Sequence, residues 1–164
     1  MGCDIHMYVE IKTESGWESG DYFRVSYPLA KKPELQLVEL YGYRNYALFA
    51  VLANVRNRGY NYIDSPRGIP DDATNFVKSE YEDWRYDAHS ASYFTLRELI
   101  DYHEEHKPRY DDFRNDYILT PLIEKMKERA HDLYFIHDFQ WNGDGRKEAM
   151  KRANDIRIVF WFDN

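Results

Sequence analysis

Two Asp-x-His pairs carry the side chains best suited to chemistry in this sequence. Asp4 and His6 stand near its start, and Asp87 and His89 repeat the same spacing in its middle. A carboxylate beside an imidazole can orient the ring as a general base, and the two groups can also share a metal ion. We therefore predict that Asp4, His6 and His89 are catalytic if the protein is an enzyme.

The same four residues, Asp4, His6, Asp87 and His89, also form a candidate metal site. Two imidazoles and two carboxylates suit a zinc or manganese ion. No H-E-x-x-H or C-x-x-C motif accompanies them, so the identity of any cofactor stays open, with a divalent metal as one option.

Groups that suit a phosphate lie beside the second pair and in a proline-framed loop. Ser90 and Ser92 precede a segment with helix signals, and the N–H groups at a helix N-terminus attract anions. Arg67 lies between Pro66 and Pro70, which restrict the loop, and its guanidinium can donate to two phosphate oxygens at once. We predict that Arg67, Ser90 and Ser92 bind a small phosphate-bearing ligand.

Further candidates flank the most apolar segment of the chain, residues 44–56. Tyr43 and Arg44 stand at its start, and Arg56 and Arg58 at its end. An arginine at the end of a buried helix needs a partner, which is either a carboxylate or a bound anion. Tyr43 and Arg44 are therefore added to the ligand-binding candidates.

Each candidate also has an ordinary structural explanation. Asp4 and His6 suit the solvent-facing side of a strand, and Asp87 and Ser92 suit a turn or a helix cap. Arg67 can simply pair with a surface acid. A shared site requires that the two Asp-x-His pairs and Arg67 surround one hollow. If they do, the functional interpretation is favoured; if they do not, the structural explanation of each residue is favoured.

The elements that would position these groups are predicted from periodicity. Apolar residues alternate with polar ones over 3–12 and again over 156–163, which predicts strands that pair with each other. We also expect strands over 17–27, interrupted near Gly20, and over 34–40. Helices are expected over 44–56, 72–84, 95–105, 119–133 and 147–153. The predicted class is α+β, a single domain over 1–164, with a small antiparallel sheet that includes the N- and C-terminal strands and helices packed on one face.

Composition limits the classes of partner. Aromatic residues make up 17% of the chain, enough to build a folded core. The net charge of −7 repels polyanions, so no long nucleic acid is expected as a partner. We expect no membrane association and a cytoplasmic location, because the chain has no long apolar run, no signal-peptide pattern at its start and a single cysteine.

Five stretches carry a resemblance that covers nearly the whole chain: 1–6 together with Glu10, 44–57, 66–70, 89–92 and 160–164. They resemble a family of small proteins found in bacteriophage genomes and in some bacteria, and the opening Met-Gly-Cys-Asp-Ile-His is the most distinctive stretch. The resemblance implies a phage origin and a cytosolic accessory role, and it brings no catalytic residues. Small phage proteins of this kind include counter-defence factors that sequester or cleave nucleotide signals, which is an analogy of class only.

Three functions follow from these observations. The preferred one is a phage-type accessory protein, with a counter-defence role, that sequesters a small phosphate-bearing nucleotide in an Arg/His/aromatic pocket. The alternatives are a metal-dependent phosphodiesterase that cleaves such a nucleotide, and an acidic inhibitor that covers a site on a host protein. Capture is preferred to cleavage because no complete metal or nucleophile motif is present. The oligomeric state and the identity of the ligand stay open.

Overall fold

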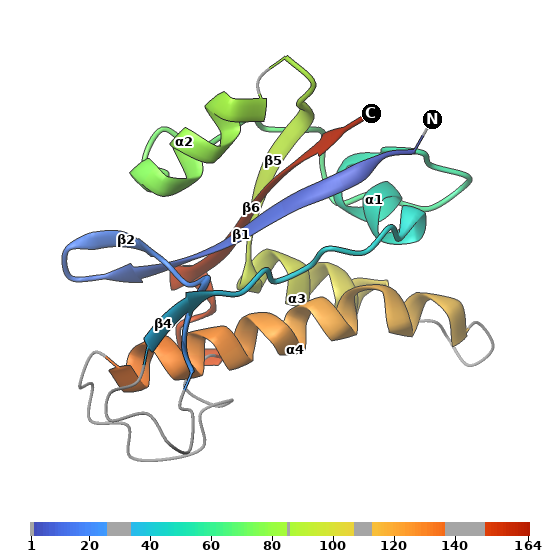
Figure 1. The fold of residues 1–164 in the computed structure, drawn as a ribbon. Coiled ribbons are helices and arrows are strands. Elements are labelled where there is room, and N and C mark those ends of the chain that lie inside the picture. Colours follow the sequence, from blue (N-terminus) through green and yellow to red (C-terminus); the bar gives the residue numbers. More distant parts are fainter. Residues whose placement is uncertain (1, 26–33, 85, 107–112, 137–149) are drawn as a thin grey trace.

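A four-stranded antiparallel sheet with the order β2-β1-β6-β5 forms the centre of the protein (Figure 1). The computed structural model describes residues 2–25, 34–84, 86–106, 113–136 and 150–164. The strands of the main sheet are β1 (Asp4–Thr13), β2 (Gly16–Ser19), β5 (His89–Thr95) and β6 (Ile156–Asp163), and a second sheet pairs β3 (Tyr22–Val25) with β4 (Glu34–Leu37). The helical elements of the described residues are α1 (Tyr46–Ala53), α2 (Asn75–Trp84), α3 (Leu96–Glu105), α4 (Phe113–Ile136) and the 3₁₀ turn η1 (Ala153–Asp155).

The first and last strands pair along the whole of β6, as their alternation predicted. Asp4 lies opposite Asp163, and Ile11 lies opposite Ile156, in an antiparallel register. Alternate side chains of β1 point to opposite faces, so Cys3 and its odd-numbered neighbours enter the larger core. β6 has a neighbour on each side and is buried on both faces, which explains its consecutive apolar residues.

Helices cover the two faces of this sheet unequally. On one face, α1, α3 and α4 enclose the larger core around Ile5 and Phe160. On the other face, Val77 of α2 packs against Val159 and Trp161. The α+β class, with both end strands in one antiparallel sheet, is confirmed. The expected packing of helices on one face describes α1, α3 and α4, whereas α2 lies across the sheet from them (Figure 1).

Side-chain caps set two of the helix boundaries. The Asn45 side chain accepts a hydrogen bond from the Leu48 N–H (3.2 Å) at the start of α1. The helix ends at Asn54, which adopts a left-handed backbone conformation (φ 59°). At the start of α3, where a helix was expected from residue 95, Thr95 and Glu98 form a capping box. These caps determine where the chain leaves α1 and enters α3, which together with α4 border the pocket described below.

Other elements differ from the sequence expectation. The return strand expected over 17–27 is interrupted at Gly20, as predicted, but its two parts, β2 and β3, belong to different sheets; a Cβ at Gly20 would be 2.9 Å from a methyl of Val9. The strand expected over 34–40 is the shorter β4. α4 begins at Phe113, so Pro121 lies inside the helix and not in its first turn. Most of the helix expected over 147–153 lies outside the described residues.

The stretch that precedes α3 was not expected to be a strand. It forms β5, which pairs with β6, and Ser90 and Ser92 therefore belong to a strand and not to a helix N-terminus. The strand forms because Ala91 enters the smaller core and Phe94 the larger one; between them, Ser92 is fully buried and Tyr93 is half-buried. The predicted role of the two serines as donors at a helix end thus loses its structural basis.

Candidate ligand pocket

Asp4 forms an ion pair with Arg44 in which both of its carboxylate oxygens accept a hydrogen bond. Arg44 Nε and Nη2 donate to the two Asp4 carboxylate oxygens at 2.5 and 2.7 Å. This hydrogen bonding lowers the pKa of the Asp4 carboxyl. The guanidinium also lies against Gly2, where a Cβ would approach Nη1 to 2.5 Å. Two of the sequence candidates therefore meet, but Arg44 engages a carboxylate of its own chain.

His6 has a different carboxylate partner from the one predicted. Its Nε2 lies 3.4 Å from Oδ2 of Asp163, the residue opposite Asp4 on β6. The ring packs between Trp84 and Trp161, with centroid distances of 4.2 and 5.7 Å. His6 is thus largely buried under α2 and joins the ends of β1 and β6.

His89 lies on the other face of the sheet from His6. His6 is opposite Trp161 and His89 is opposite Phe162, and consecutive residues of β6 point to opposite faces. The His89 ring stacks on Phe162 at 5.9 Å, and its Nδ1 lies 3.1 Å from the Ser90 hydroxyl. The structure therefore does not bring the two Asp-x-His pairs together. β6 lies between them, and the two histidines point to opposite faces of the sheet.

The metal site predicted from Asp4, His6, Asp87 and His89 is not formed. Asp87 is exposed in the turn before β5. Within the part of the chain that the structure describes, no group of three His, Cys, Asp or Glu residues is placed to hold a metal ion. The predicted catalytic set of Asp4, His6 and His89 is divided between the two faces in the same way.

Arg67 lies beside Ser92, as predicted, but its guanidinium forms ion pairs with acidic residues of its own chain. The Arg67 backbone N–H donates to the Ser92 hydroxyl at 3.2 Å. The guanidinium donates to Asp64 (3.1 Å) and Glu98 (2.7 Å) and lies 4.6 Å from the centroid of the Phe94 ring. The proline-framed loop thus covers β5, and the ordinary ion-pair explanation of Arg67 fits these contacts.

The two remaining candidates are at separate places. Ser90 has a positive φ of 51° at the irregularity between His89 and Ser92, with its hydroxyl beside the His89 ring. Tyr43 is 72% exposed and lies near Lys125. The predicted residues therefore do not surround one hollow.

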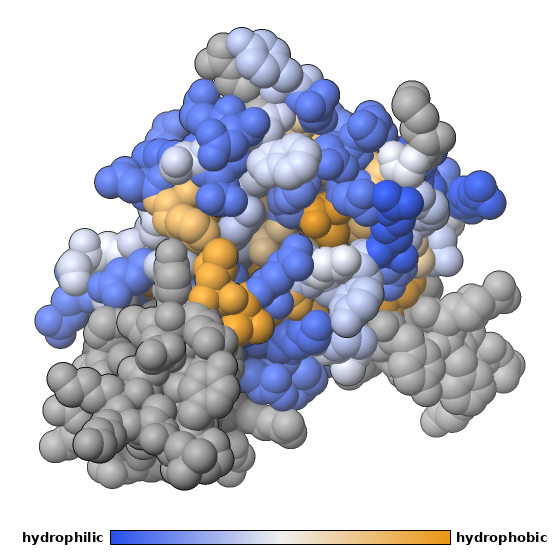
Figure 2. Space-filling model, viewed as in Figure 1, coloured by the Kyte–Doolittle hydropathy of each residue, from blue (hydrophilic) through white to orange (hydrophobic). Residues whose placement is uncertain are grey.

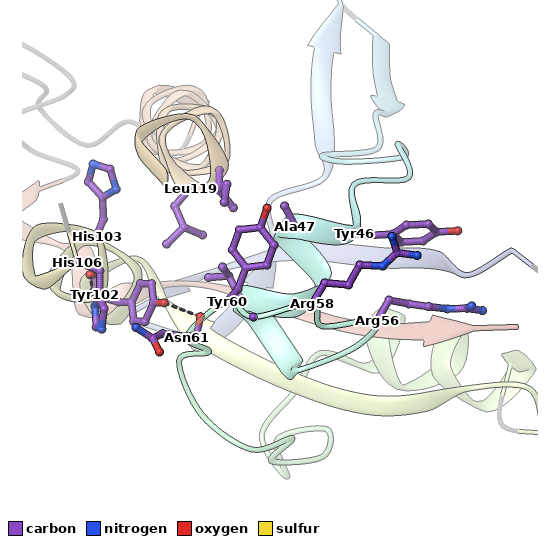
Figure 3. Close-up of a pocket in the computed structure, with 13 residues that line it drawn as sticks. Tyr46, Ala47, Arg56, Arg58, Tyr60, Asn61, Tyr102, His103, His106 and Leu119 are labelled. Carbon is purple, nitrogen blue, oxygen red and sulfur yellow. Dashed lines mark hydrogen bonds between the residues drawn. The ribbon is translucent and has the colours of Figure 1, made fainter. Parts of the chain in front are cut away.

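A different cavity, of about 620 Å³, lies between α1, the segment that follows it, the end of α3 and α4 (Figure 3). We call it the arginine–histidine pocket. Its described lining contains two arginines and two histidines and no Asp or Glu. The lining residues are Tyr46, Ala47, Val51, Arg56, Arg58, Gly59, Tyr60, Asn61, Tyr102, His103, His106, Ile118 and Leu119.

The segment 54–61 forms the part of the wall that carries both arginines. Asn54 and Arg56 have positive φ values of 59° and 52°, which are uncommon for residues other than glycine. The Asn57 side chain holds the turn: its Oδ1 accepts from the N–H groups of Gly59 (2.9 Å) and Tyr60 (2.8 Å). Its Nδ2 donates to the Tyr60 carbonyl (2.8 Å) and to Asn54 Oδ1 (2.7 Å).

Asn57 therefore uses both ends of its amide to hold one backbone shape. A further hydrogen bond, from the Ile63 N–H to the Val51 carbonyl (2.9 Å), returns the segment to α1. A segment held in this way loses little conformational entropy when a ligand binds. Its geometry thus suits the presentation of Arg56 and Arg58.

The arginine end of the pocket is exposed and positively charged. Arg56 lies 5.8 Å from the centroid of the Tyr46 ring, and the two project together with Arg58 at one side of the cavity (Figure 3). Among the residues that the structure describes, none forms a hydrogen bond or an ion pair with Arg58. The Arg58 guanidinium can therefore donate to an anion without breaking such a contact.

The histidine end of the pocket is built on α3. The Tyr102 hydroxyl donates to the Asn61 carbonyl at 2.7 Å, which joins α3 to the segment 54–61 (Figure 3). The His106 ring stacks on Tyr102 at 4.0 Å, and its Nδ1 lies 2.9 Å from the Tyr102 carbonyl oxygen. Since a carbonyl only accepts, Nδ1 carries the proton, and Nε2 is the acceptor in the neutral ring.

Sequence reasoning found part of this pocket and missed the rest. Arg56 and Arg58 were recognised as cations beside the apolar helix, but the histidines of α3 were not grouped with them. The available signal was the i, i+4 spacing of Tyr102 and His106, which places both on one helix face. Nothing in the sequence indicates that this face lies across from Arg58.

Comparisons with known proteins add no relative, since no protein-family model, curated protein or solved structure matches the chain. The resemblance to a phage family therefore stays a prediction. Among the described helices, none combines the length and the apolar composition that crossing a bilayer requires. The function must be argued from the pocket itself.

Proposed function

We propose that the protein captures a small phosphate-bearing nucleotide in the arginine–histidine pocket and holds it without cleaving it, as a phage-type accessory protein. The observation that carries the proposal is the charge of the lining. The chain as a whole carries a net charge of −7, yet the described lining combines two arginines and two histidines with no carboxylate. Such a local reversal of charge favours an anion.

The arginine end is suited to the phosphate. A guanidinium offers a planar set of donors that matches two phosphate oxygens, and hydrogen bonds of this charge-assisted kind contribute about 1.5–3 kcal/mol each. Arg58 has no competing carboxylate among the described residues, in contrast to Arg44 and Arg67, which are paired with Asp4 and Glu98. The phosphate is therefore placed between Arg56 and Arg58.

The tyrosines supply surfaces for the base. Tyr60 lies between the arginine end and the histidine end of the pocket, and Tyr46 and Tyr102 flank it on either side (Figure 3). Stacking of a base on an aromatic ring contributes about 1–3 kcal/mol. A volume of about 620 Å³ lies within the range of roughly 300–1,000 Å³ that small-molecule sites occupy. The base is placed against Tyr60, with His103 and His106 available to its edge.

Capture is favoured over hydrolysis by the side chains that line the pocket. Its described lining offers no carboxylate to act as a base, and no described group of three His, Cys, Asp or Glu residues is placed to hold a metal. Hydrolysis and the inhibition of a host protein remain the two alternatives. By analogy with counter-defence factors among small phage proteins, we propose that the captured nucleotide is a defence signal.

Retention of nucleotides tests the proposal directly. The protein is incubated with a panel of linear and cyclic mononucleotides and dinucleotides, separated from unbound material, and heated to release what it holds. Mass spectrometry that finds an intact nucleotide supports capture. New products instead identify a hydrolase. If the protein neither retains nor cleaves any nucleotide of the panel, capture and hydrolysis are both excluded, and inhibition of a host protein becomes the favoured function.

Variants then assign the binding to this pocket. Arg58→Gln removes a cation with no described partner, so it should weaken the affinity for a retained nucleotide by about 10- to 100-fold and leave the melting temperature unchanged. Lys12→Gln is the matched control, because it removes one positive charge from an exposed residue on β1 that lies outside the lining. Equal affinity of Arg58→Gln and the parent protein would place the nucleotide elsewhere.

A further inference from the structure

A second, smaller cavity of about 250 Å³ lies where β2 ends alongside β1. It is lined by Met7, Tyr8, Asp21, Leu37 and Glu39. Figure 2 shows apolar surface gathered beside the end of β4, where Leu37 is 55% exposed. None of these residues belongs to the arginine–histidine pocket. We call this cavity the Asp21 cavity, and it has no role in the proposed function.

The Asp21 carboxyl is buried with one oxygen unused. The residue is only 1% exposed, and its Oδ2 accepts the Val9 backbone N–H at 3.0 Å. Its Oδ1 is also buried, and it has no hydrogen-bond partner among the described residues. A buried oxygen without a partner loses the hydrogen bonds that it makes to water in the unfolded chain, so such atoms call for an explanation. Because Asp21 lines the cavity, a ligand there that donates to Oδ1 would explain the unused oxygen.

The charges around the cavity are mostly negative. Glu39 lines it from the segment after β4, and the Tyr8 hydroxyl donates to Glu80 of α2 at 2.9 Å. Burial, the Glu80 hydrogen bond and the charges of Glu80, Asp21 and Glu39 all raise the pKa of Tyr8. Three carboxylates are therefore near enough to Tyr8 to raise its pKa, and two of them, Asp21 and Glu39, line the cavity.

The cation next to Asp21 is directed elsewhere. Arg129 of α4 donates from Nη1 to the Asp21 backbone carbonyl at 3.3 Å and from Nη2 to the Val38 carbonyl at 2.8 Å. Its charge lowers the pKa of Asp21, and so does the Val9 N–H, but burial outweighs both and raises that pKa to about 7. Glu10, the other acid close to Asp21, is paired with Arg157 at 2.7 Å. Among the described residues, neither Asp21 Oδ1 nor the Glu39 carboxylate therefore accepts a hydrogen bond from Arg129.

We propose that the Asp21 cavity binds the primary ammonium group of a short alkylamine, with its N–H groups donating to Asp21 Oδ1 and to the Glu39 carboxylate. The alkyl chain then contacts Met7 and Leu37, and the positive charge lies near the Tyr8 ring. The cavity is smaller than roughly 300 Å³, the lower end of the range for drug-sized ligands, so the ligand is short. The same ammonium chemistry is found in free amines and in the lysine side chain of a partner.

Titration by NMR tests this site with defined probes. n-Butylammonium is added to the ¹⁵N-labelled protein, and the amide signals of Val9, Asp21 and Glu39 are followed; saturable shifts of these signals are expected. 1-Butanol has the same alkyl chain without the charge and should shift them at least tenfold less at equal concentration. A blocked lysine tripeptide distinguishes the sources: saturable binding of the peptide identifies a partner side chain, and binding of the free amine alone identifies a metabolite-sized ligand.

Two variants and one control complete the test. Asp21→Asn and Glu39→Gln should each weaken n-butylammonium binding at least tenfold, and Glu39→Gln is an independent check because Glu39 is exposed. Asp83→Asn removes an exposed acid of α2 outside the cavity and should leave binding unchanged. The proposal is overturned if the amine shifts none of the three amides, if 1-butanol binds equally well, or if Asp83→Asn weakens binding as much as Glu39→Gln.

Discussion

Replacing Asp21 with asparagine changes how the stability of the protein depends on pH. Burial raises the pKa of this carboxyl to about 7 in the folded protein, against an ordinary value of 3.8 for the unfolded chain. Below pH 3.8 the carboxyl is protonated in both states. Between these two values the unfolded chain loses the proton while the folded protein keeps it, so the free energy of unfolding falls as the pH rises towards 7.

The size of this loss follows from the separation of the two pKa values. About three pH units, at about 1.36 kcal/mol each, correspond to about 4 kcal/mol above pH 7. Asparagine matches the protonated carboxyl in shape, does not ionise, and still offers an oxygen to the Val9 N–H. Asp21→Asn should therefore equal the parent protein in stability near pH 4 and exceed it by about 4 kcal/mol at pH 8.

Urea denaturation of both proteins at intervals from pH 4 to pH 8 measures the difference directly, because carboxylates elsewhere contribute equally to both and cancel. Asp83→Asn serves as the control for loss of an exposed charge and should show a difference that does not vary with pH. Parallel pH profiles for Asp21→Asn and the parent protein would refute the reasoning, since they would mean that Asp21 titrates alike in the folded and unfolded states.

Three further predictions concern the pocket and the residues that lie outside it. Asn57→Ala removes four hydrogen bonds from the turn that carries the arginines; it should lower the free energy of unfolding by about 1–3 kcal/mol and weaken nucleotide retention at least tenfold, as measured by urea denaturation and calorimetry. Arg67→Ala should lower the melting temperature without changing nucleotide affinity, because its guanidinium bonds Asp64 and Glu98; a loss of affinity at unchanged stability would restore Arg67 to the site. Nucleotide affinity should fall steadily as sodium chloride is raised from 50 to 500 mM, since the arginine end is exposed and therefore screened; a salt-independent affinity would argue against a phosphate contact there.

The features that could be predicted from the sequence are those determined by neighbouring residues. The alternation in 3–12 and 156–163 predicted the two end strands, since one buried face imposes a period of two. The Thr95 capping box is equally local, because the partners are three residues apart. In the same way, the close approach of Gly20 to β1 appears in the sequence only as an interruption of the return strand.

The functional geometry depends on contacts between distant segments. His6 and His89 each follow an aspartate by two residues, so their local sequences look alike. They lie on opposite faces of the sheet because they pair with consecutive residues of β6, and neither local sequence indicates that register. The arginine–histidine pocket joins Arg58 to His103 through the docking of α3 against the segment 54–61, where one hydrogen bond from Tyr102 makes the link. A cation and an imidazole that far apart in the chain give no local pattern.

The order of strands in the main sheet has a consequence for biosynthesis. β1 and β5 each touch β6 but not each other, and the N–H of Asp4 donates to a carboxylate oxygen of a residue 159 positions later. Because a ribosome releases the chain from its amino end, the edge of β1 that pairs with β6 stays unpaired until β6 has emerged. The nascent chain therefore exposes an unpaired strand edge until the residues of β6 have been added, and its yield in cells should depend on chaperones that shield such edges.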